Sequence, residues 1–255
     1  MSADRFSKIG LARKLKLPWL EKTTSLLRAG YAPAKNRVML RDQLQGAFPD
    51  SNPELRGSLN KTISILSTTW LEPPALLLPL RDEALQLLAS ETESRQPGIP
   101  NLALHWGMLM AVYPFWAAVA TQTGRLLRLQ DSIQSSQVQR RIREQFGERE
   151  TVSAGTSRVL RSFKDWGLLP SNSLRGLYSA SITWEIKDPK LISWLIEALL
   201  HSQPRSLAPL KELLDSPALF PFKIMSWENA RLLESAPRLE LFRQSLNEQL
   251  VMLRR

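Results

Sequence analysis

The stretch that decides the fold is residues 135–169, with the sequence SSQVQRRIREQFGERETVSAGTSRVLRSFKDWGLL. Its first part has apolar residues every four positions, a spacing typical of one face of a helix. These residues are Val138, Ile142 and Phe146. Gly147 is expected to end this helix, and Thr151 to cap a second helix that ends at Gly167. The stretch therefore predicts two amphipathic helices joined by a short polar link.

Polar and basic side chains cover the faces of both helices that the apolar residues leave free. On the second helix they are Ser153, Ser157, Arg158, Arg161 and Lys164. On the first helix they are Arg140, Arg141 and Arg143. Arginine suits the binding of a nucleic acid because its planar guanidinium group can form two hydrogen bonds with the edge of a guanine or with a phosphate.

After the second helix, the spacing of the apolar residues changes from that of a helix to that of a strand. Residues 170–176 are rich in turn-forming types, and residues 178–186 then alternate strictly between apolar and polar side chains. Such alternation predicts a half-buried strand, here as part of one small two-stranded hairpin. Two helices, a turn and a hairpin follow one another in the order of a winged helix-turn-helix, in which the second helix enters the DNA major groove.

The charge of the chain is concentrated in two blocks. Against 24 acidic residues stand 34 basic ones, which gives a net charge of +10 and a pI near 10.2. Residues 1–41 carry +8 and residues 125–164 carry +5, whereas residues 42–124 carry −4. In the first block Arg13, Lys14 and Lys16 alternate with leucines, as in a basic amphipathic helix or a nucleic-acid arm. A polyanion is the expected partner, with nucleic acid ahead of an anionic membrane surface.

Residues 102–186 resemble the winged-helix superfamily in the order of their elements and in the turn Lys164-Asp165-Trp166-Gly167-Leu168-Leu169. The resemblance implies that Ser153, Ser157, Arg158 and Arg161 face double-stranded DNA and that Arg175 contacts a phosphate from the tip of the wing. It also implies that Arg140, Arg141 and Arg143 meet the sugar-phosphate backbone. Winged helices also serve as protein–protein modules, which is the alternative interpretation.

The layout of the whole chain is similar to that of BrxA-type proteins of bacterial phage-exclusion (BREX) systems. The stretches that carry this similarity are WLEKTTSLLRAG at 19–30 and RVLRSFKDWGLL at 158–169. The resemblance implies a non-enzymatic, DNA-binding accessory protein of phage defence, with other subunits of a defence complex as further partners.

Helical periodicity dominates the rest of the chain, which predicts a mostly α, multi-helix protein that contains the winged helix. The expected helices cover residues 19–30, 38–46, 52–69, 76–88, 102–120, 191–200 and 237–253. A polar loop at 91–100 suggests a division into a basic helical region (1–98), a winged-helix domain (99–187) and a C-terminal helical region (188–255). Leucines spaced by seven in 237–253 are compatible with a helix that pairs with a second copy in a homodimer. Packing of this helix on the protein's own core is the favoured interpretation.

The apolar segment 102–120 is long enough to span a bilayer. Two features argue against a membrane span. The interior of the segment contains His105, Gly107 and Pro114, and an arginine-rich pattern follows it. We therefore interpret it as a core helix, without excluding a contact with membrane, and expect the protein in the cytoplasm.

Enzyme chemistry finds little support in this sequence. It has no cysteine, no phosphate-binding loop and no paired metal-ligand spacing, so neither a metal nor another cofactor is expected. Its two histidines, His105 and His201, fit core or capping positions better than a general base. A DNA-binding protein is the leading hypothesis, and a scaffold subunit of a nucleic-acid machine that binds RNA or an acidic protein is the alternative.

Overall fold

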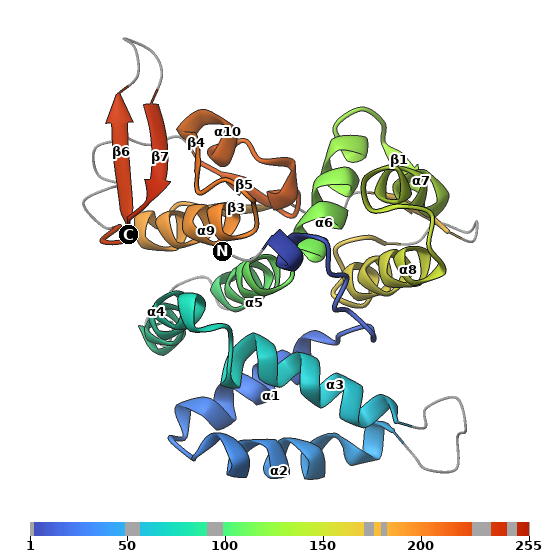
Figure 1. The fold of residues 1–255 in the computed structure, drawn as a ribbon, viewed down its shortest axis with the longest axis vertical. Coiled ribbons are helices and arrows are strands. Elements are labelled where there is room, and N and C mark those ends of the chain that lie inside the picture. Colours follow the sequence, from blue (N-terminus) through green and yellow to red (C-terminus); the bar gives the residue numbers. More distant parts are fainter. Residues whose placement is uncertain are drawn as a thin grey trace.

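The structure is a computed structural model that describes residues 3–48, 57–90, 99–170, 176–179, 183–225, 236–243 and 249–254. Within these residues the chain forms ten α-helices, a few turns of 3-10 and π-helix, and seven short strands (Figure 1). The predicted fold class, mostly α, is therefore confirmed.

Three helices form a layer at one end of the molecule, the lower end in Figure 1. They are α1 (Leu17–Arg28), α2 (Pro33–Leu44) and α3 (Ser58–Leu66). Helix α3 continues into one turn of π-helix, η4 (Ser67–Leu71), and both α1 and α2 contact this turn. Short 3-10 turns lie at Ala3–Phe6 (η1), Gln45–Ala47 (η2) and Ala75–Leu77 (η5).

The centre of the molecule is α5 (Ile99–Val112), between α4 (Leu78–Ser90) and α9 (Pro189–His201). Every residue of α5 from Leu102 to Val112 is buried, which explains why this helix is apolar on all sides. Helices α5 and α9 approach closely because Gly107 has no side chain. A Cβ at this position would overlap the indole ring of Trp194 on α9.

The expected single helix over residues 102–120 is wrong. The chain breaks at Tyr113, and α6 (Pro114–Leu127) leaves at an angle of 118° to the preceding helix. The cause is Pro114, which lacks the N–H that would continue the helix and excludes helical geometry from the residue before it. Tyr113 accordingly has φ −120° and ψ 89°.

In the described part of the chain, we find no individual helix with both the length and the apolar character that a bilayer crossing requires. Residues Asn101–Val112 and Pro114–Leu127 meet these two criteria only when they are taken together across the 118° bend.

After α6 the elements run β1 (Ser132–Gln134), α7 (Ser135–Phe146), α8 (Glu150–Asp165) and β2 (Leu177–Ser179). Both helices agree with the sequence prediction to within about a residue. The N-cap of α7 is Gln134, and that of α8 is Arg149 rather than the predicted Thr151. The N–H of Gln134 donates to Oε1 of Gln137 (2.8 Å), which ties the start of α7 to its first turn.

The predicted continuous strand over 178–186 is also wrong, since its two ends belong to different sheets. Strand β2 pairs antiparallel with β1, and β3 (Trp184–Ile186) pairs in parallel with β5 (Phe222–Ile224). Residues 180–182 lie outside the described chain. The alternation of apolar and polar residues along a segment indicates which side chains are buried. It does not indicate which other strand the segment pairs with.

The C-terminal region contains a hairpin where a helix over 237–253 was expected. Strand β6 (Leu239–Arg243) pairs antiparallel with β7 (Gln249–Leu253), and β4 (Leu207–Pro209) pairs with the other edge of β7. In this register Leu239 pairs with Leu253 and Leu241 pairs with Val251, so the apolar residues on this side follow a period of two in each strand. Short helical elements α10 (Leu210–Leu214) and η7 (Pro217–Leu219) complete the region.

A partly buried ion-pair network fixes this hairpin to the helices. The guanidinium of Arg238, just before β6, donates to both carboxylate oxygens of Glu197 on α9 (2.8 and 2.9 Å) and to Glu83 on α4. Buried residues from all three predicted domains belong to one hydrophobic core. The division into three domains stays a prediction.

Candidate nucleic-acid interface

Helix α8 carries the residues that the sequence singled out for DNA, on the side opposite its buried face. Val152, Val159 and Phe163 are buried against the core. The other side carries Ser153, Ser157 and Arg158, which are half-buried, and Arg161 and Lys164, which are exposed. The predicted face therefore exists as a surface of the protein.

The C-terminal end of α8 is fixed by a Schellman motif. Gly167 has φ +75°, its N–H donates to the carbonyl of Lys164 (2.9 Å), and the N–H of Leu168 donates to the carbonyl of Phe163 (2.9 Å). This is the glycine cap that the sequence predicted. It turns the buried Leu168 and Leu169 back to the core and leaves Lys164 at the surface.

The basic N-terminal segment, residues 7–16, lies along α8 as an irregular chain with neither helix nor strand. The N–H of Leu15 donates to Oγ of Ser162 (2.8 Å), and Nε1 of Trp166 donates to the carbonyl of Leu15 (2.9 Å). Nζ of Lys14 also forms an ion pair with Oδ2 of Asp165 (2.7 Å). The segment is thus neither a helix nor a free arm, because its backbone is bound to the side chains of α8.

Close packing brings the segment and the helix together. Gly155 is buried on α8, and a Cβ there would lie only 2.6 Å from Cγ2 of Ile9. At the start of the segment, Nη2 of Arg5 donates to the carbonyl of His201 (2.9 Å) and also to that of Ala111. One guanidinium thereby caps the C-terminal ends of α5 and α9 and anchors the segment at its far end.

Three guanidinium groups gather where the segment meets α8. Partial burial lowers the pKa of Arg158, and the positive charges of Arg13 and Arg161 lower it further. Among the described residues, no acid forms an ion pair with any of these three arginines. Like charges held together without a counter-charge favour the binding of an external anion.

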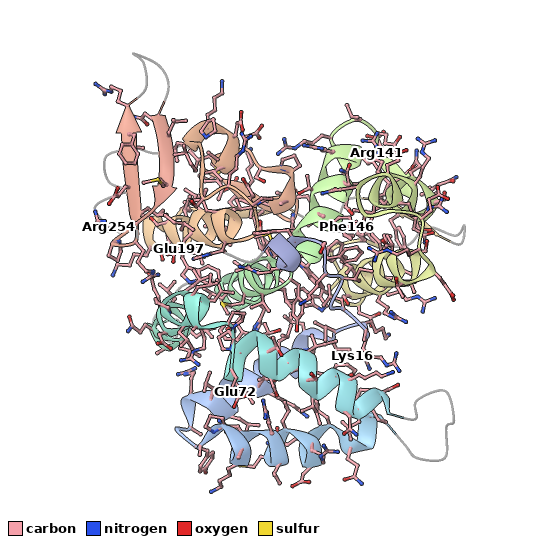
Figure 2. The ribbon with its side chains drawn as sticks, viewed as in Figure 1. Lys16, Glu72, Arg141, Phe146, Glu197 and Arg254 are labelled. Atoms are coloured by element: carbon pink, nitrogen blue, oxygen red, sulfur yellow. The ribbon has the colours of Figure 1, made fainter. Side chains whose placement is uncertain are left out.

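Arg13 and the neighbouring Lys16 also have uncharged partners within the protein. Arg13 donates from Nε to Oγ of Ser58 (3.0 Å) and from Nη1 to the carbonyl of Ala12 (2.9 Å). Nζ of Lys16 lies 5.4 Å from the ring centre of Trp19, and Figure 2 shows Lys16 between the ribbons of α3 and α8. The side chain of Lys16 is exposed, so its charge adds to the same surface.

The three arginines of α7 do not form one surface with α8. Gln139 on α7 faces α8, since its Nε2 donates to Oγ of Ser157 (3.0 Å). Arg143 lies one turn further on this side, whereas Arg141 lies on the opposite side of the helix. Figure 2 shows Arg141 at the outer edge of α7, and Arg140 is exposed and forms an ion pair with Glu144 (3.8 Å).

The structure limits what can be said of two further predicted DNA contacts, Ser157 and Arg175. Ser157 is already bonded on both sides, because its hydroxyl accepts from Gln139 and donates to the carbonyl of Ser153 (3.0 Å). Arg175, the predicted contact at the tip of the wing, lies outside the described residues. The sequence also missed that residues 7–16 join this surface, since nothing local indicates contacts with residues about 150 positions away.

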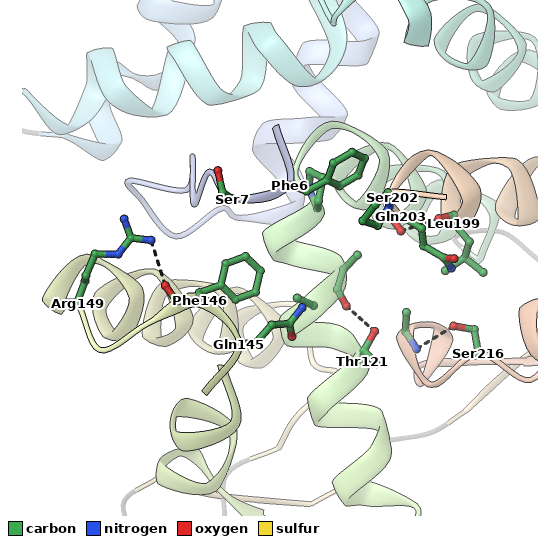
Figure 3. Close-up of a pocket in the computed structure, with 15 residues that line it drawn as sticks. Phe6, Ser7, Thr121, Gln145, Phe146, Arg149, Leu199, Ser202, Gln203 and Ser216 are labelled. Atoms are coloured by element: carbon green, nitrogen blue, oxygen red, sulfur yellow. Dashed lines mark hydrogen bonds between the residues drawn. The ribbon is translucent and has the colours of Figure 1, made fainter. Parts of the chain in front are cut away.

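A separate cleft of about 520 Å³ opens at the turn between α7 and α8 (Figure 3). Phe6 and Phe146 line it together with Gln145, Gln203 and Arg149. Of the described residues in its wall, Arg149 alone is charged, and it donates to the carbonyl of Phe146 (3.1 Å). Among the described residues that line this cleft there is neither an acid nor a histidine.

The two histidines lie apart from the basic surface. His105 is fully buried and packs edge-on against Trp70, with 5.2 Å between the ring centres, and burial lowers its pKa to about 3. His201 lies 3.6 Å from Glu197 in the ion-pair network of α9. Among the described residues, no group of three or more histidine and acidic side chains has the arrangement of a metal site.

The chain matches no known protein-family model, and no curated protein or solved structure is significantly similar to it. The resemblances to the winged-helix superfamily and to BrxA-type proteins therefore stay predictions.

Proposed function

We propose that this protein binds double-stranded DNA through α8 and the N-terminal segment that lies along it. The observation that supports this most is the cluster of Arg13, Arg158 and Arg161, three cations without an acidic partner in the described structure. Phosphate backbones supply the repeated negative charge that such a cluster attracts. Arg161 and Lys164, being exposed on the outer face of α8, are the residues available to enter a groove.

The order of elements supports a winged-helix type of binding. The succession α6, β1, α7, α8 and β2, with β1 and β2 paired antiparallel, agrees with a helix pair followed by a wing. The N–H of Ser179 on β2 also donates to the carbonyl of Pro170 (3.2 Å). Strand β2 therefore lies next to the residue that follows the end of α8. In this arrangement α8 is the recognition helix.

A role in bacterial phage defence of the BREX type is part of the proposal and rests on the resemblance alone. The two stretches that carry it correspond to α1 and to the end of α8 with its glycine cap. The protein is proposed to act without catalysis in the cytoplasm, as a DNA-binding accessory subunit.

A salt titration with matched variants tests the DNA-binding proposal. Arg158→Ala/Arg161→Ala is expected to weaken binding to a duplex by at least about 10-fold, because each lost arginine contact is worth about 1–3 kcal/mol. The control Lys211→Ala/Lys223→Ala removes the same charge from exposed residues on α10 and β5, and it should bind like the wild type.

Four outcomes of this titration are informative. Unaltered binding by the α8 variant at an unchanged thermal midpoint would contradict the role of α8. Equal losses in both variants would indicate a nonspecific effect of net charge. Tighter binding to single-stranded RNA than to duplex DNA would favour the RNA-binding alternative, and no binding to any nucleic acid would favour a protein scaffold.

A further inference from the structure

We infer that the basic surface continues from α8 across α3 to α2, so that the N-terminal helical layer binds phosphates next to the site that α8 contacts. This inference rests on the proposed function, and it adds Arg41 and Lys61 to the interface. Neither residue belongs to the winged-helix elements.

The first step is the position of Arg13 between the two parts of the protein. Its charge acts on Arg158 of α8, and its Nε donates to Oγ of Ser58 at the first position of α3 (3.0 Å). Ser58 is buried, so this contact fixes the segment against α3. The N-terminal segment is therefore a bridge between α8 and α3.

The second step is the outer face of α3. At about 100° per residue, Lys61 lies about 60° around the helix from Ser58, and Asn60 lies about 100° beyond Lys61. Both Lys61 and Asn60 are exposed. Oδ1 of Asn60 accepts a hydrogen bond from Nη1 of Arg41 on α2 (2.7 Å), and Arg41 is exposed as well. The cations thus follow one another from the segment over α3 to α2.

The third step is the charge balance along this path. No described acid forms an ion pair with Arg41 or Lys61. The neighbouring Arg37 on α2 differs, because its guanidinium is bonded to Glu72. Arg41 uses Nη1 for Asn60 and retains donors for an outside acceptor. The path therefore offers uncompensated positive charge from α8 to α2.

The chemistry of the partner follows from this extended arrangement. A single phosphate or nucleotide would meet one of these cations, whereas a nucleic-acid backbone repeats its charge and can meet several in succession. Of the nucleic acids, duplex DNA is the partner already proposed for α8. The same duplex, continuing past α8, would place its backbone over α3 and α2.

The experiment compares Lys61→Ala/Arg41→Ala with Lys211→Ala/Lys223→Ala on duplexes of about 10 and about 30 base pairs, since about 10 base pairs make one helical turn. On the long duplex, loss of two phosphate contacts should lower the slope of log K against log salt by about 1.8. If the affinities converge at 1 M salt, this corresponds to a loss of about 60-fold at 0.1 M. On the short duplex the variant should bind like the wild type, and Lys61→Arg should keep wild-type affinity on both.

The outcomes separate this inference from the proposed function. An unchanged slope on the long duplex, together with weaker binding of Arg158→Ala/Arg161→Ala, would overturn the inference and leave the proposed function standing. A loss equal to that of the control variant would also overturn it. If the wild type bound neither duplex, both the inference and the proposed function would fail. Equal thermal midpoints of the variants exclude misfolding as the cause of a loss.

Discussion

Ser162→Ala tests how the N-terminal segment is held against α8. Oγ of Ser162 accepts a 2.8 Å hydrogen bond from the N–H of Leu15, and both residues are buried. Alanine would leave this N–H without a partner where water does not reach it, which costs about 1–3 kcal/mol. The hydroxyl also donates to the carbonyl of Arg158, but that carbonyl keeps the helical N–H of residue 162 as a donor.

The expected loss can be measured in two ways. For a chain of this size, 1 kcal/mol lowers the thermal midpoint by about 2–4 °C, so scanning calorimetry should record a decrease of about 2–12 °C. Amide hydrogen exchange at Leu15 should also become faster than in the wild type, because the donor has lost its acceptor. If Arg13 contributes to the proposed interface, the affinity for duplex DNA should fall together with this protection.

Ser25→Ala is the matched control for this variant. Its hydroxyl makes the same bond to a carbonyl four residues earlier, that of Glu21 (2.9 Å), but it is exposed on α1. We expect a change below about 0.5 kcal/mol. A thermal midpoint of Ser162→Ala equal to that of the control, with the Leu15 amide still protected, would refute the reasoning.

Two further predictions concern the core. Gly107→Ala should destabilise the protein by about 1–3 kcal/mol in urea unfolding, because the new Cβ would overlap Trp194. The control Gly46→Ala should leave the stability unchanged, because no atom lies within 4 Å of its Cβ position. Equal stabilities of the two variants would contradict the close packing of α5 on α9. Burial lowers the pKa of His105 to about 3, against about 6.5 unfolded, so the unfolded chain takes up a proton in this window that the folded chain does not. The free energy of unfolding should therefore fall from pH 6.5 towards 3, by up to about 1.4 kcal/mol per pH unit, and a His105→Phe variant with the same pH profile as the wild type would argue against this.

Local signals predicted the helices of the interface well. The four-residue spacing of α7 and the glycine after α8 are properties of adjacent residues, so they specify a helix and its end without knowledge of the rest of the chain. The exposed face of α8 follows from the same spacing. Competing local signals explain two errors, since Pro114 breaks an otherwise helical run, and the leucines at 239–253 fit a helix as well as a hairpin.

The remaining features depend on residues far apart in the chain. Strand β1 has three residues, too few for a recognisable pattern, and β3 finds its partner about 40 residues later. The contact of the basic N-terminal segment with α8 also has no local signature. The sequence indicated two basic blocks, but only the fold brings Arg13 of the first block to Arg158 and Arg161 of the second.

The contact between Leu15 and Ser162 has a consequence for the order in which the protein is made. Its two residues are 147 positions apart, and Arg5 bonds a carbonyl 196 positions away. At about 5–20 residues per second, a ribosome reaches Ser162 about 7–30 s after Leu15. During this time Lys14 and Leu15 lack their native partners on α8. The basic surface is thus assembled only once α8 has been synthesised, well after the residues of the N-terminal segment.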